Sequence, residues 1–206
     1  MQNLLKYIDE ILDLEWEMFQ DVQNIGGRAS CQNDQKQFFI MRCSQFSTWS
    51  SAAAGAYLED LRQAKAEGSN PLTLKYAYMM KSTSPKEYEE LAAKLPPVTL
   101  EKQALVEELV AQTITWCEAF ARQYPKIAAH GRPLHSKMDR PGITSVETYS
   151  RGEFSSYSMQ TLQLLSEHYS RMAMMGRNLH TEVVSCEMSL LHMGSLDDVE
   201  NKLSNM

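Results

Sequence analysis

Polar side chains that could do chemistry stand at positions where the helical pattern predicts burial. Glu15 is the first, since it lies four residues from both Ile11 and Phe19, on the apolar side of its segment. A carboxylate buried there must be paired, hydrogen-bonded or protonated, because an isolated buried charge costs several kcal/mol. Glu15 is therefore an acid, a base or a ligand-binding group, or it forms a structural ion pair with Arg28 or Arg42, and we favour the ion pair.

Arg42 and Gln45 raise the same question one helical turn apart, inside the segment FFIMRCSQFSTW, whose other residues favour burial. A guanidinium presents a fixed fork of donors that suits a carboxylate or a phosphate. A buried arginine demands a partner but does not specify which one. Its partner is an anionic ligand or Glu15, and both interpretations stay open.

A third group of polar residues lies in the segment SVETYSRGEFSSYS. Tyr149, Glu153 and Tyr157 recur every four residues and so share one helix face, with a carboxylate between two phenols. They could transfer protons or orient a substrate, or they could form a polar seam between helices. Glu147 and Arg151 are also four residues apart and are expected to form an ordinary surface pair.

The segment NIGGRASCQNDQ, residues 24–35, joins the first two expected helices, and its two glycines are expected to end the first of them. Its glycines match neither a phosphate loop nor a dinucleotide-binding fingerprint. Cys31 lies near the start of the next helix and close to Arg28, where a thiol can have a lowered pKa and become a nucleophile. The alternative, which we favour, is a small packed side chain.

The longest irregular stretch is HGRPLHSKMDRPGITS, residues 130–145, which is locally basic in an acidic chain. It is either a lid that clamps an anionic substrate or a solvated loop. Its basic residues are His130, Arg132, His135, Lys137 and Arg140.

Neither HExxH nor Glu-x-x-His pairs are present, so no metal site is expected, and the sequence identifies no cofactor. The candidate catalytic residues are Glu15, Cys31, Tyr149 and Glu153. The candidate ligand-binding residues are Arg28, Gln32, Arg42, Gln45, His135, Arg140, Arg151 and Tyr157.

Most of these residues lie in segments with a helical period, and no clear alternating strand pattern is present. The segment 33–67 has apolar or small residues on every face of its middle part, which is typical of a buried central helix. Ser145 is placed to cap a later helix that Gly152 weakens. We predict an all-α, single-domain bundle of about seven helices over residues 1–206, with a buried central second helix. The expected helical segments are 2–22, 33–67, 72–81, 85–95, 99–124, 146–175, 178–191 and 195–203.

Composition narrows the class of protein. The 206 residues carry a formal net charge of −6, which argues against general nucleic-acid binding. No apolar run approaches the roughly 20 residues that span a bilayer, and acidic residues interrupt the first apolar segment, so we expect neither a membrane helix nor a signal peptide. The four cysteines lack disulfide or metal spacing, which fits reduced thiols in the cytoplasm.

The chain resembles the bacterial family catalogued as domain of unknown function 4125. The resemblance rests on EWEMF at 15–19, NIGGRASCQ at 24–32, IMRCSQFSTW at 40–49, ETYSRGEFSSYS at 147–158 and SLDDVE at 195–200. It implies a cytosolic bacterial protein and brings no established reaction and no assigned residues.

Two functions are compatible with these observations. The first is a small enzyme that acts on an anionic small molecule through a polar Glu/Arg/Tyr/Cys pocket. The second is a non-catalytic helical module that binds a ligand or partner, in which the polar residues only fix helix register. Convergence of Glu15, Arg28, Arg42 and Glu153 on one pocket that solvent can reach would favour the first, and a closed core without a cavity would exclude it.

Overall fold

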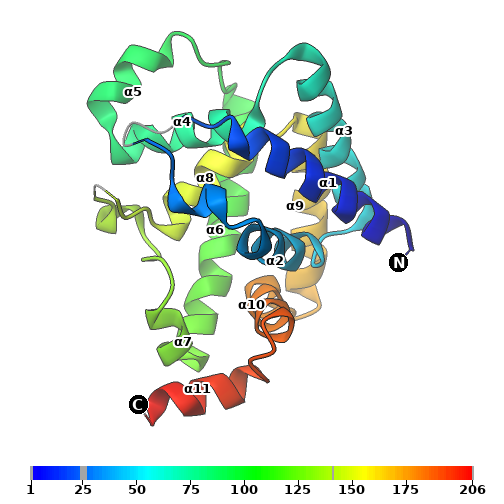
Figure 1. Cartoon of the computed structure of the whole chain (residues 1–206), viewed down its shortest axis with the longest axis vertical. Helices are drawn as coiled ribbons and strands as arrows, with labels where there is room; N and C mark the ends of the chain where they lie inside the picture. The colour runs from blue at the N-terminus through cyan, green and yellow to red at the C-terminus, as the bar shows by residue number, and fades with distance from the viewer. Residues whose placement is uncertain (1, 24–26, 141, 206) are drawn as a thin grey trace.

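The computed structural model describes residues 2–23, 27–140 and 142–205, and over these ranges every regular element is helical (Figure 1). The predicted all-α class is confirmed. The predicted number of about seven helices is wrong, since the described residues form eleven α-helices and two short 3-10 helices. None of the helices in these ranges is both long and apolar enough to cross a membrane. The elements are α1 (Gln2–Gln20), η1 (Ser30–Asn33), α2 (Gln35–Phe46), α3 (Ser51–Glu67), α4 (Pro71–Thr83), α5 (Pro85–Ala92), α6 (Leu100–Gln123), α7 (Pro125–Ala129), η2 (Ser136–Met138), α8 (Val146–Ser156), α9 (Met159–Met174), α10 (Leu179–Leu190) and α11 (Leu196–Ser204).

Two serine caps account for much of the difference in helix number. The segment 33–67 was expected as one helix but is divided into α2 and α3, and the Ser50 hydroxyl accepts a hydrogen bond from the Ala53 N–H at 3.2 Å. The segment 146–175 is divided in the same way into α8 and α9, where Ser158 accepts from the Thr161 N–H at 3.1 Å. A serine at an N-cap satisfies an otherwise unpaired backbone donor and favours a new helix start.

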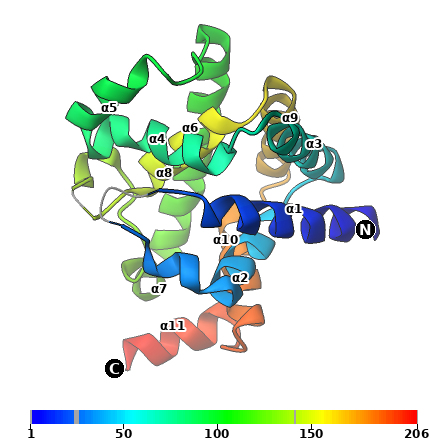
Figure 2. The same cartoon turned by 45° about the horizontal axis from the view of Figure 1, so that its top comes forward.

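The central helix is α8 rather than the second helix of the chain. It has no exposed residue and packs between α4 and α6, as Figures 1 and 2 show. Both parts of the expected second helix keep a solvent face, with Lys36 and Met41 exposed on α2 and Glu59 and Arg62 exposed on α3. The all-round apolar character of the segment 33–67 arose because its two parts bury different faces against different neighbours.

Gly152 determines how closely α8 approaches α4. A Cβ atom at this position would lie 2.5 Å from Met79 Cγ and 2.8 Å from the carbonyl oxygen of Lys75. This oxygen belongs to the backbone, so it cannot rotate away as a side chain can. The expectation that Gly152 weakens its helix is therefore replaced by a packing role: the absent side chain lets the two backbones meet.

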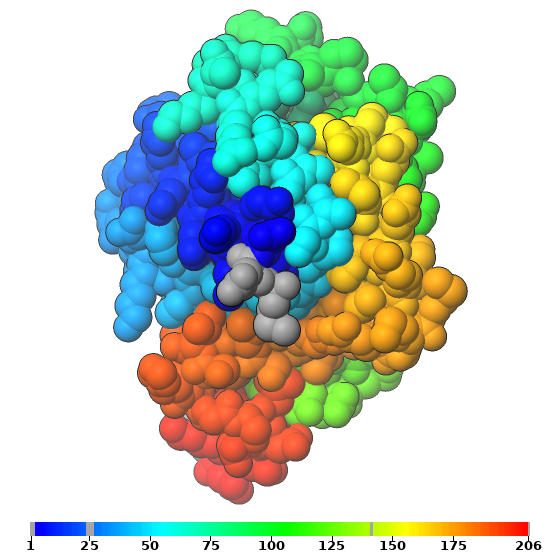
Figure 3. Space-filling view, turned by 90° about the vertical axis from the view of Figure 1, so that its right-hand side faces the viewer, coloured from blue at the N-terminus to red at the C-terminus, as the bar shows by residue number. Residues whose placement is uncertain are grey.

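The hydrophobic core is continuous across α1, α3, α6 and α9, and Figure 3 shows α1, α3 and α9 side by side on one face of the molecule. Its fully buried members include Ile11, Leu61, Leu109 and Leu165. A smaller cluster of Phe120, Tyr124 and Leu196 fixes α11 against the end of α6 and α7. Four charged residues are buried between the helices, Glu15 of α1, Arg42 of α2, Lys75 of α4 and Glu153 of α8.

Candidate functional site

A cavity of about 620 Å³ lies where α1, α2, α4, α8 and α10 face one another. Much of its lining is aromatic, including Phe38, Trp116 and Tyr169. Its size falls within the range of pockets that hold small molecules. Exposed residues also line it, among them Met41 and Arg132, so the cavity opens to the surface beside α2 and the loop 130–145.

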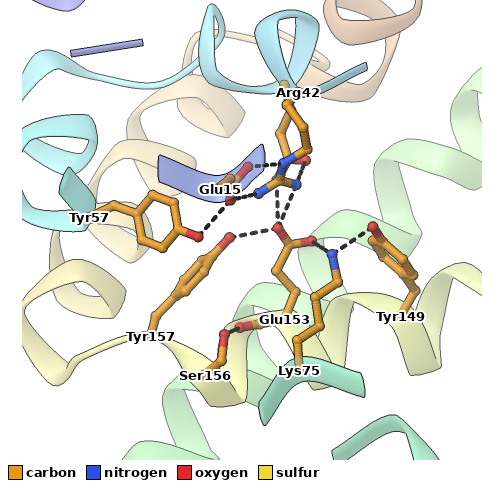
Figure 4. A network of polar contacts seen from close by, with 9 residues as sticks. Glu15, Arg42, Tyr57, Lys75, Tyr149, Glu153, Ser156 and Tyr157 are labelled. Atoms are coloured by element: carbon orange, nitrogen blue, oxygen red, sulfur yellow. Dashed lines mark hydrogen bonds and ion pairs between the residues drawn. The ribbon is translucent and has the colours of Figure 1, made fainter. Parts of the chain in front are cut away.

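Arg42 and Glu15 form a bidentate ion pair at one wall of this cavity (Figure 4). Arg42 donates from Nε to Glu15 Oε2 at 2.6 Å and from Nη2 to Oε1 at 2.5 Å. Glu15 is 0% exposed and Arg42 is 7% exposed. The structural ion pair predicted from the sequence is confirmed, and Arg42 is the partner.

The guanidinium of Arg42 also donates to acceptors other than Glu15. Its Nη1 donates to Gln45 Oε1 at 2.6 Å and to Glu153 Oε1 at 2.7 Å. Four of the five N–H groups of a guanidinium are thus used by protein acceptors. Arg42 therefore joins α1, α2 and α8, and it retains little capacity to bind a ligand directly.

Glu153 is the second buried carboxylate of the site. Its Oε1 accepts from Arg42 and from the Tyr157 hydroxyl, the latter at 2.8 Å, and its Oε2 lies 3.3 Å from Lys75 Nζ. Burial acts to raise the pKa of Glu153, but the charges of Arg42 and Lys75 outweigh it and lower the pKa to about 2. Glu153 is therefore ionised at neutral pH and serves as the counter-ion of both cations.

Two buried phenols complete the hydrogen bonding of the carboxylates. Tyr57 donates to Glu15 Oε1 at 2.6 Å, and Tyr157 donates to Glu153 (Figure 4). Burial raises the pKa of both tyrosines well above the ordinary value, so both remain donors. Sequence reasoning missed Tyr57, because its small and apolar neighbours on α3 indicated only core packing.

Lys75 is a further residue of the site that sequence reasoning missed. It is 6% exposed and lines the cavity from α4. Its Nζ donates to Tyr149 Oη at 2.6 Å and lies 3.8 Å from the centre of the Tyr149 ring. Lys75 stands three residues after Leu72 and four before Met79, both buried, so the spacing rule that identified Glu15 would have identified it.

The Tyr149 hydroxyl accepts from Lys75, and its own proton has no acceptor among the described residues. Burial raises the pKa of Tyr149, so the phenol stays protonated and can donate to a ligand in the cavity. Burial also lowers the pKa of Lys75, while the charge of Glu153 opposes that change. Tyr149 and Lys75 thus present a phenolic donor and a buried amine to the same cavity.

Arg132 approaches the same phenol from the loop 130–145, with its guanidinium carbon 4.8 Å from the centre of the Tyr149 ring. It donates to the carbonyl oxygen of Thr144 at 3.2 Å, and no carboxylate pairs with it among the described residues. The charged groups that act on Tyr149 include three cations (Arg42, Lys75 and Arg132) and two carboxylates (Glu15 and Glu153), and two further carboxylates, Asp34 and Glu187, line the same cavity. Among the three cations, Arg132 is the one without a carboxylate partner in the described part of the chain.

α10 closes another side of the cavity with His180 and Glu187. The two residues are seven apart and share a helix face. His180 meets the Phe120 ring edge-on, with centroids 5.0 Å apart, and burial lowers its pKa to about 4. Burial raises the pKa of Glu187. Sequence reasoning did not assign either residue to the site.

The sequence of the chain matches the family described as "Protein of unknown function (DUF4125)" over residues 5–201. The chain belongs to this family. No curated protein and no solved structure matches it significantly. The resemblance predicted from the sequence is confirmed, and the cavity of this DUF4125 protein is built within the matched range.

In this DUF4125 protein Arg28 lies outside the cavity. It donates to Gln20, to Asn33 Oδ1 at 2.9 Å and to the carbonyl oxygen of Gln32 at 2.8 Å. Of the four residues expected to converge, Glu15, Arg42 and Glu153 do so, and Arg28 instead holds η1 against the end of α1.

Gln32 is buried and also belongs to the end of α1. Its Nε2 donates to the carbonyl oxygens of Phe19 at 2.7 Å and Val22 at 3.1 Å, and its Oε1 accepts from the Ala29 N–H. The helix therefore ends at Gln20 under a side-chain cap, before the glycines that were expected to stop it. Gly26 lies outside the described residues.

Three further candidates lie away from the cavity. His135 and Arg151 line a separate depression of about 330 Å³, where His135 lies 3.3 Å from Glu118. Arg151 pairs with Glu107 at 2.7 Å and with Glu147 at 3.0 Å, which confirms the expected surface pair. Arg140 is exposed, and its backbone forms two hydrogen bonds with that of Ile143.

Asp139, which sequence reasoning treated only as the one acid of the loop 130–145, anchors that loop. Its carboxylate accepts from the Ser145 N–H at 2.7 Å and from the hydroxyls of Ser82 and Thr148, each at 2.5 Å. The loop is thereby tied to α4 and α8, and this attachment places Arg132 over Tyr149.

Cys31 is exposed in η1 and lines the cavity. The expectation of a small packed side chain is wrong for Cys31, because η1 lies over the cavity mouth rather than within the core. Cys117 is the buried thiol of the cavity wall, and burial raises its pKa to about 12. No cluster of His, Cys, Asp and Glu suited to a metal ion occurs among the described residues.

Proposed function

We propose that this DUF4125 protein is a cytosolic bacterial enzyme that binds an anionic small molecule in the central cavity. The observation that carries the proposal is Arg132, a cation that lies over the Tyr149 ring without a carboxylate partner among the described residues, at a cavity large enough for a metabolite. Lys75 and Tyr149 each keep a donor without a partner among the described residues, and Arg132 has no paired carboxylate. A carboxylate or phosphate of a ligand would satisfy all three groups.

Tyr149 is the group best placed to transfer a proton to or from such a ligand. Its hydroxyl accepts from the Lys75 ammonium, which polarises the O–H bond and would stabilise a phenolate as it forms. Glu153 holds Lys75 in place and is itself held by Arg42, so the two carboxylates act as positioning residues. Cys31 at the mouth is accessible to a ligand but has no role in this proton transfer.

A second candidate is a non-catalytic module that binds the same ligand. The closed pairing of Arg42 with Glu15 and Glu153 favours it, because a network of this kind can serve only to fix the register of three helices. Both candidate functions predict that the ligand binds in the cavity, but only the enzyme is expected to convert it.

Binding is tested by thermal denaturation with two matched probes, 4-methylbenzoate and 4-methylbenzamide, which differ in charge. The proposal predicts that the anion raises the Tm and the amide does not. It also predicts that Arg132→Gln and Tyr149→Phe reduce the shift, because each removes a donor to the anion. Equal shifts from both probes would contradict the anionic specificity.

Turnover is tested by incubating the wild-type protein with a small-molecule extract of bacterial cells and following depleted and new species by mass spectrometry. Tyr149→Phe keeps the ring that contacts Lys75 and Arg132 but removes the hydroxyl. We expect the rate of any conversion to fall by about a hundredfold in this variant. Binding without conversion would favour the non-catalytic module.

A further inference from the structure

Lys75 differs from the surface lysines of the chain in the surroundings of its amine. The side chain is 6% exposed, yet it lines a cavity of about 620 Å³. Its ammonium has three N–H groups, of which one donates to Tyr149 and one is directed at Glu153 (Figure 4). The third has no partner among the described residues. A ligand in the cavity would therefore meet the amine directly.

The surroundings also favour the uncharged amine more than water does. Burial is the largest influence and lowers the pKa of Lys75; the nearby positive charge of Arg42 acts in the same direction, and Glu153 opposes both. A lysine with a lowered pKa has a larger fraction of free amine at neutral pH, and the free amine is the nucleophilic form. A phenol within hydrogen-bonding distance can move the protons that amine addition requires.

We propose that Lys75 is a nucleophile that forms a Schiff base with an aldehyde or ketone group of the ligand, with Tyr149 as the proton-transfer partner. The inference rests on the proposed function, because the ligand must first enter the same cavity. It narrows the ligand class from an anionic small molecule to an anionic carbonyl compound.

The addition step balances without an oxidant or reductant. The Lys75 ammonium releases one proton to solvent, and the Nζ lone pair then forms a bond to the carbonyl carbon. The C=O π pair moves to oxygen, which takes the Tyr149 proton. The phenolate recovers a proton from the nitrogen of the adduct, which leaves a neutral carbinolamine.

Loss of water completes the reaction. The carbinolamine hydroxyl leaves with the Tyr149 proton as water, and the nitrogen lone pair forms the C=N bond of a protonated imine. A proton returns from solvent to the phenolate. The net change is ammonium plus carbonyl compound to protonated imine plus water, and Glu153 remains as the counter-ion of the new cation.

The test is reductive trapping of the full-length protein with formaldehyde and sodium cyanoborohydride at neutral pH, with sites mapped by peptide mass spectrometry. Formaldehyde is small enough to enter the cavity and carries no charge, so it reports amine reactivity alone. Two lysines serve as controls. Lys65 is exposed, and Lys102 also has a pKa lowered by burial but does not line the cavity.

The inference predicts that Lys75 is trapped about tenfold faster than either control lysine at neutral pH, because only Lys75 combines a lowered pKa with a phenol and a cavity. Tyr149→Phe should slow the trapping of Lys75 and leave that of Lys102 unchanged. Trapping of Lys75 no faster than that of Lys102 in the wild-type protein would overturn the inference, and this comparison needs no variant that must fold.

A second probe separates the inference from the proposed function. Glyoxylate carries the same aldehyde with a carboxylate, so it should label Lys75 in preference to formaldehyde if the cavity selects anions. Fast trapping by formaldehyde without that preference supports the Schiff base and contradicts the anionic site. A Tm shift with 4-methylbenzoate but no trapping of Lys75 by either aldehyde supports the proposed function and overturns the inference.

Discussion

Glu15 and Arg42 face each other through two parallel hydrogen bonds, Nε–Oε2 at 2.6 Å and Nη2–Oε1 at 2.5 Å. Since Glu153 approaches the same guanidinium from α8, three helices meet at one buried cation. This arrangement explains why charged residues occur on the apolar stripes of α1 and α2. Arg132 lies beside this network at the Tyr149 ring, on the cavity lining, and no carboxylate of the described residues pairs with it.

Arg42→Met should destabilise the fold by about 3–5 kcal/mol, because it leaves the buried carboxylate of Glu15 without its cation and removes one of the two cations that pair with Glu153. Urea denaturation measures the loss. The matched control is Arg62→Met, since Arg62 also pairs with two glutamates, Glu10 and Glu59, but all three side chains are exposed. Its loss should be much smaller than that of Arg42→Met, because solvent screens exposed ion pairs. Equal effects of the two substitutions would show that burial does not determine the strength of the Arg42 network.

Gly152→Ala should destabilise the fold by about 1–3 kcal/mol, because the new Cβ would meet the carbonyl of Lys75 and force α8 away from α4. Gly55→Ala is the control, since its Cβ would meet only the ring of Tyr7, at 3.3 Å, which can move. Gly55→Ala should be neutral or gain up to about 1 kcal/mol of helix propensity. Thermal denaturation of the two variants distinguishes them, and a stabilising Gly152→Ala would contradict the close approach of the helices.

The sequence predicts the helical class because the 3.6-residue period is a local property of the chain. It also identifies Glu15 from its place on an apolar stripe, Arg42 from a segment that favours burial, and Glu153 from its four-residue spacing between two tyrosines. Lys75 obeys the same rule and could have been found. The helix starts after Ser50 and Ser158 were harder to predict, because apolar residues continue on both sides of each break.

The sequence alone could not predict which residues pair between distant segments of the chain. Arg28 and Arg151 were both expected to bind the ligand, although Glu147 was already the expected partner of Arg151. In the fold, Arg28 is used by acceptors around η1, and Arg151 pairs with Glu107 from α6, 44 residues away. Only Arg132, of the basic residues in the loop 130–145, reaches the cavity, and Asp139 fixes its position by contacts to two helices.

Cys31 should be the thiol that reacts first with a disulfide reagent such as Ellman's reagent, because it is exposed at the cavity mouth. Cys117 should react slowly in the folded protein, since it is buried and has a pKa of about 12. Stopped-flow absorbance measures the phases, and Cys31→Ser should remove the fast one. A fast phase that survives in Cys31→Ser would contradict this assignment. Protection of Cys31 by 4-methylbenzoate would place the anion near the mouth.

Glu153 should contribute to the loss of stability in acid. Its pKa is about 2 in the folded protein, compared with an ordinary value of 4.5. The unfolded chain therefore binds the proton first as pH falls, so this contribution is complete above about pH 4.5 and is lost between 4.5 and 2. The free energies of unfolding of wild type and Glu153→Gln, measured in urea over this range, should converge toward low pH. Parallel curves would contradict a depressed pKa.

His180 should act in a separate and higher pH window. Burial lowers its pKa to about 4 in the folded protein, whereas the ordinary value is 6.5. Between these values the unfolded chain carries the proton and the folded chain does not, so stability falls as pH decreases from 6.5 to 4. His168 is also buried with a lowered pKa, so His180→Gln should remove only part of this slope. Urea titrations at several pH values in this window measure it, and an unchanged slope in His180→Gln would contradict a lowered pKa of His180 in the folded protein.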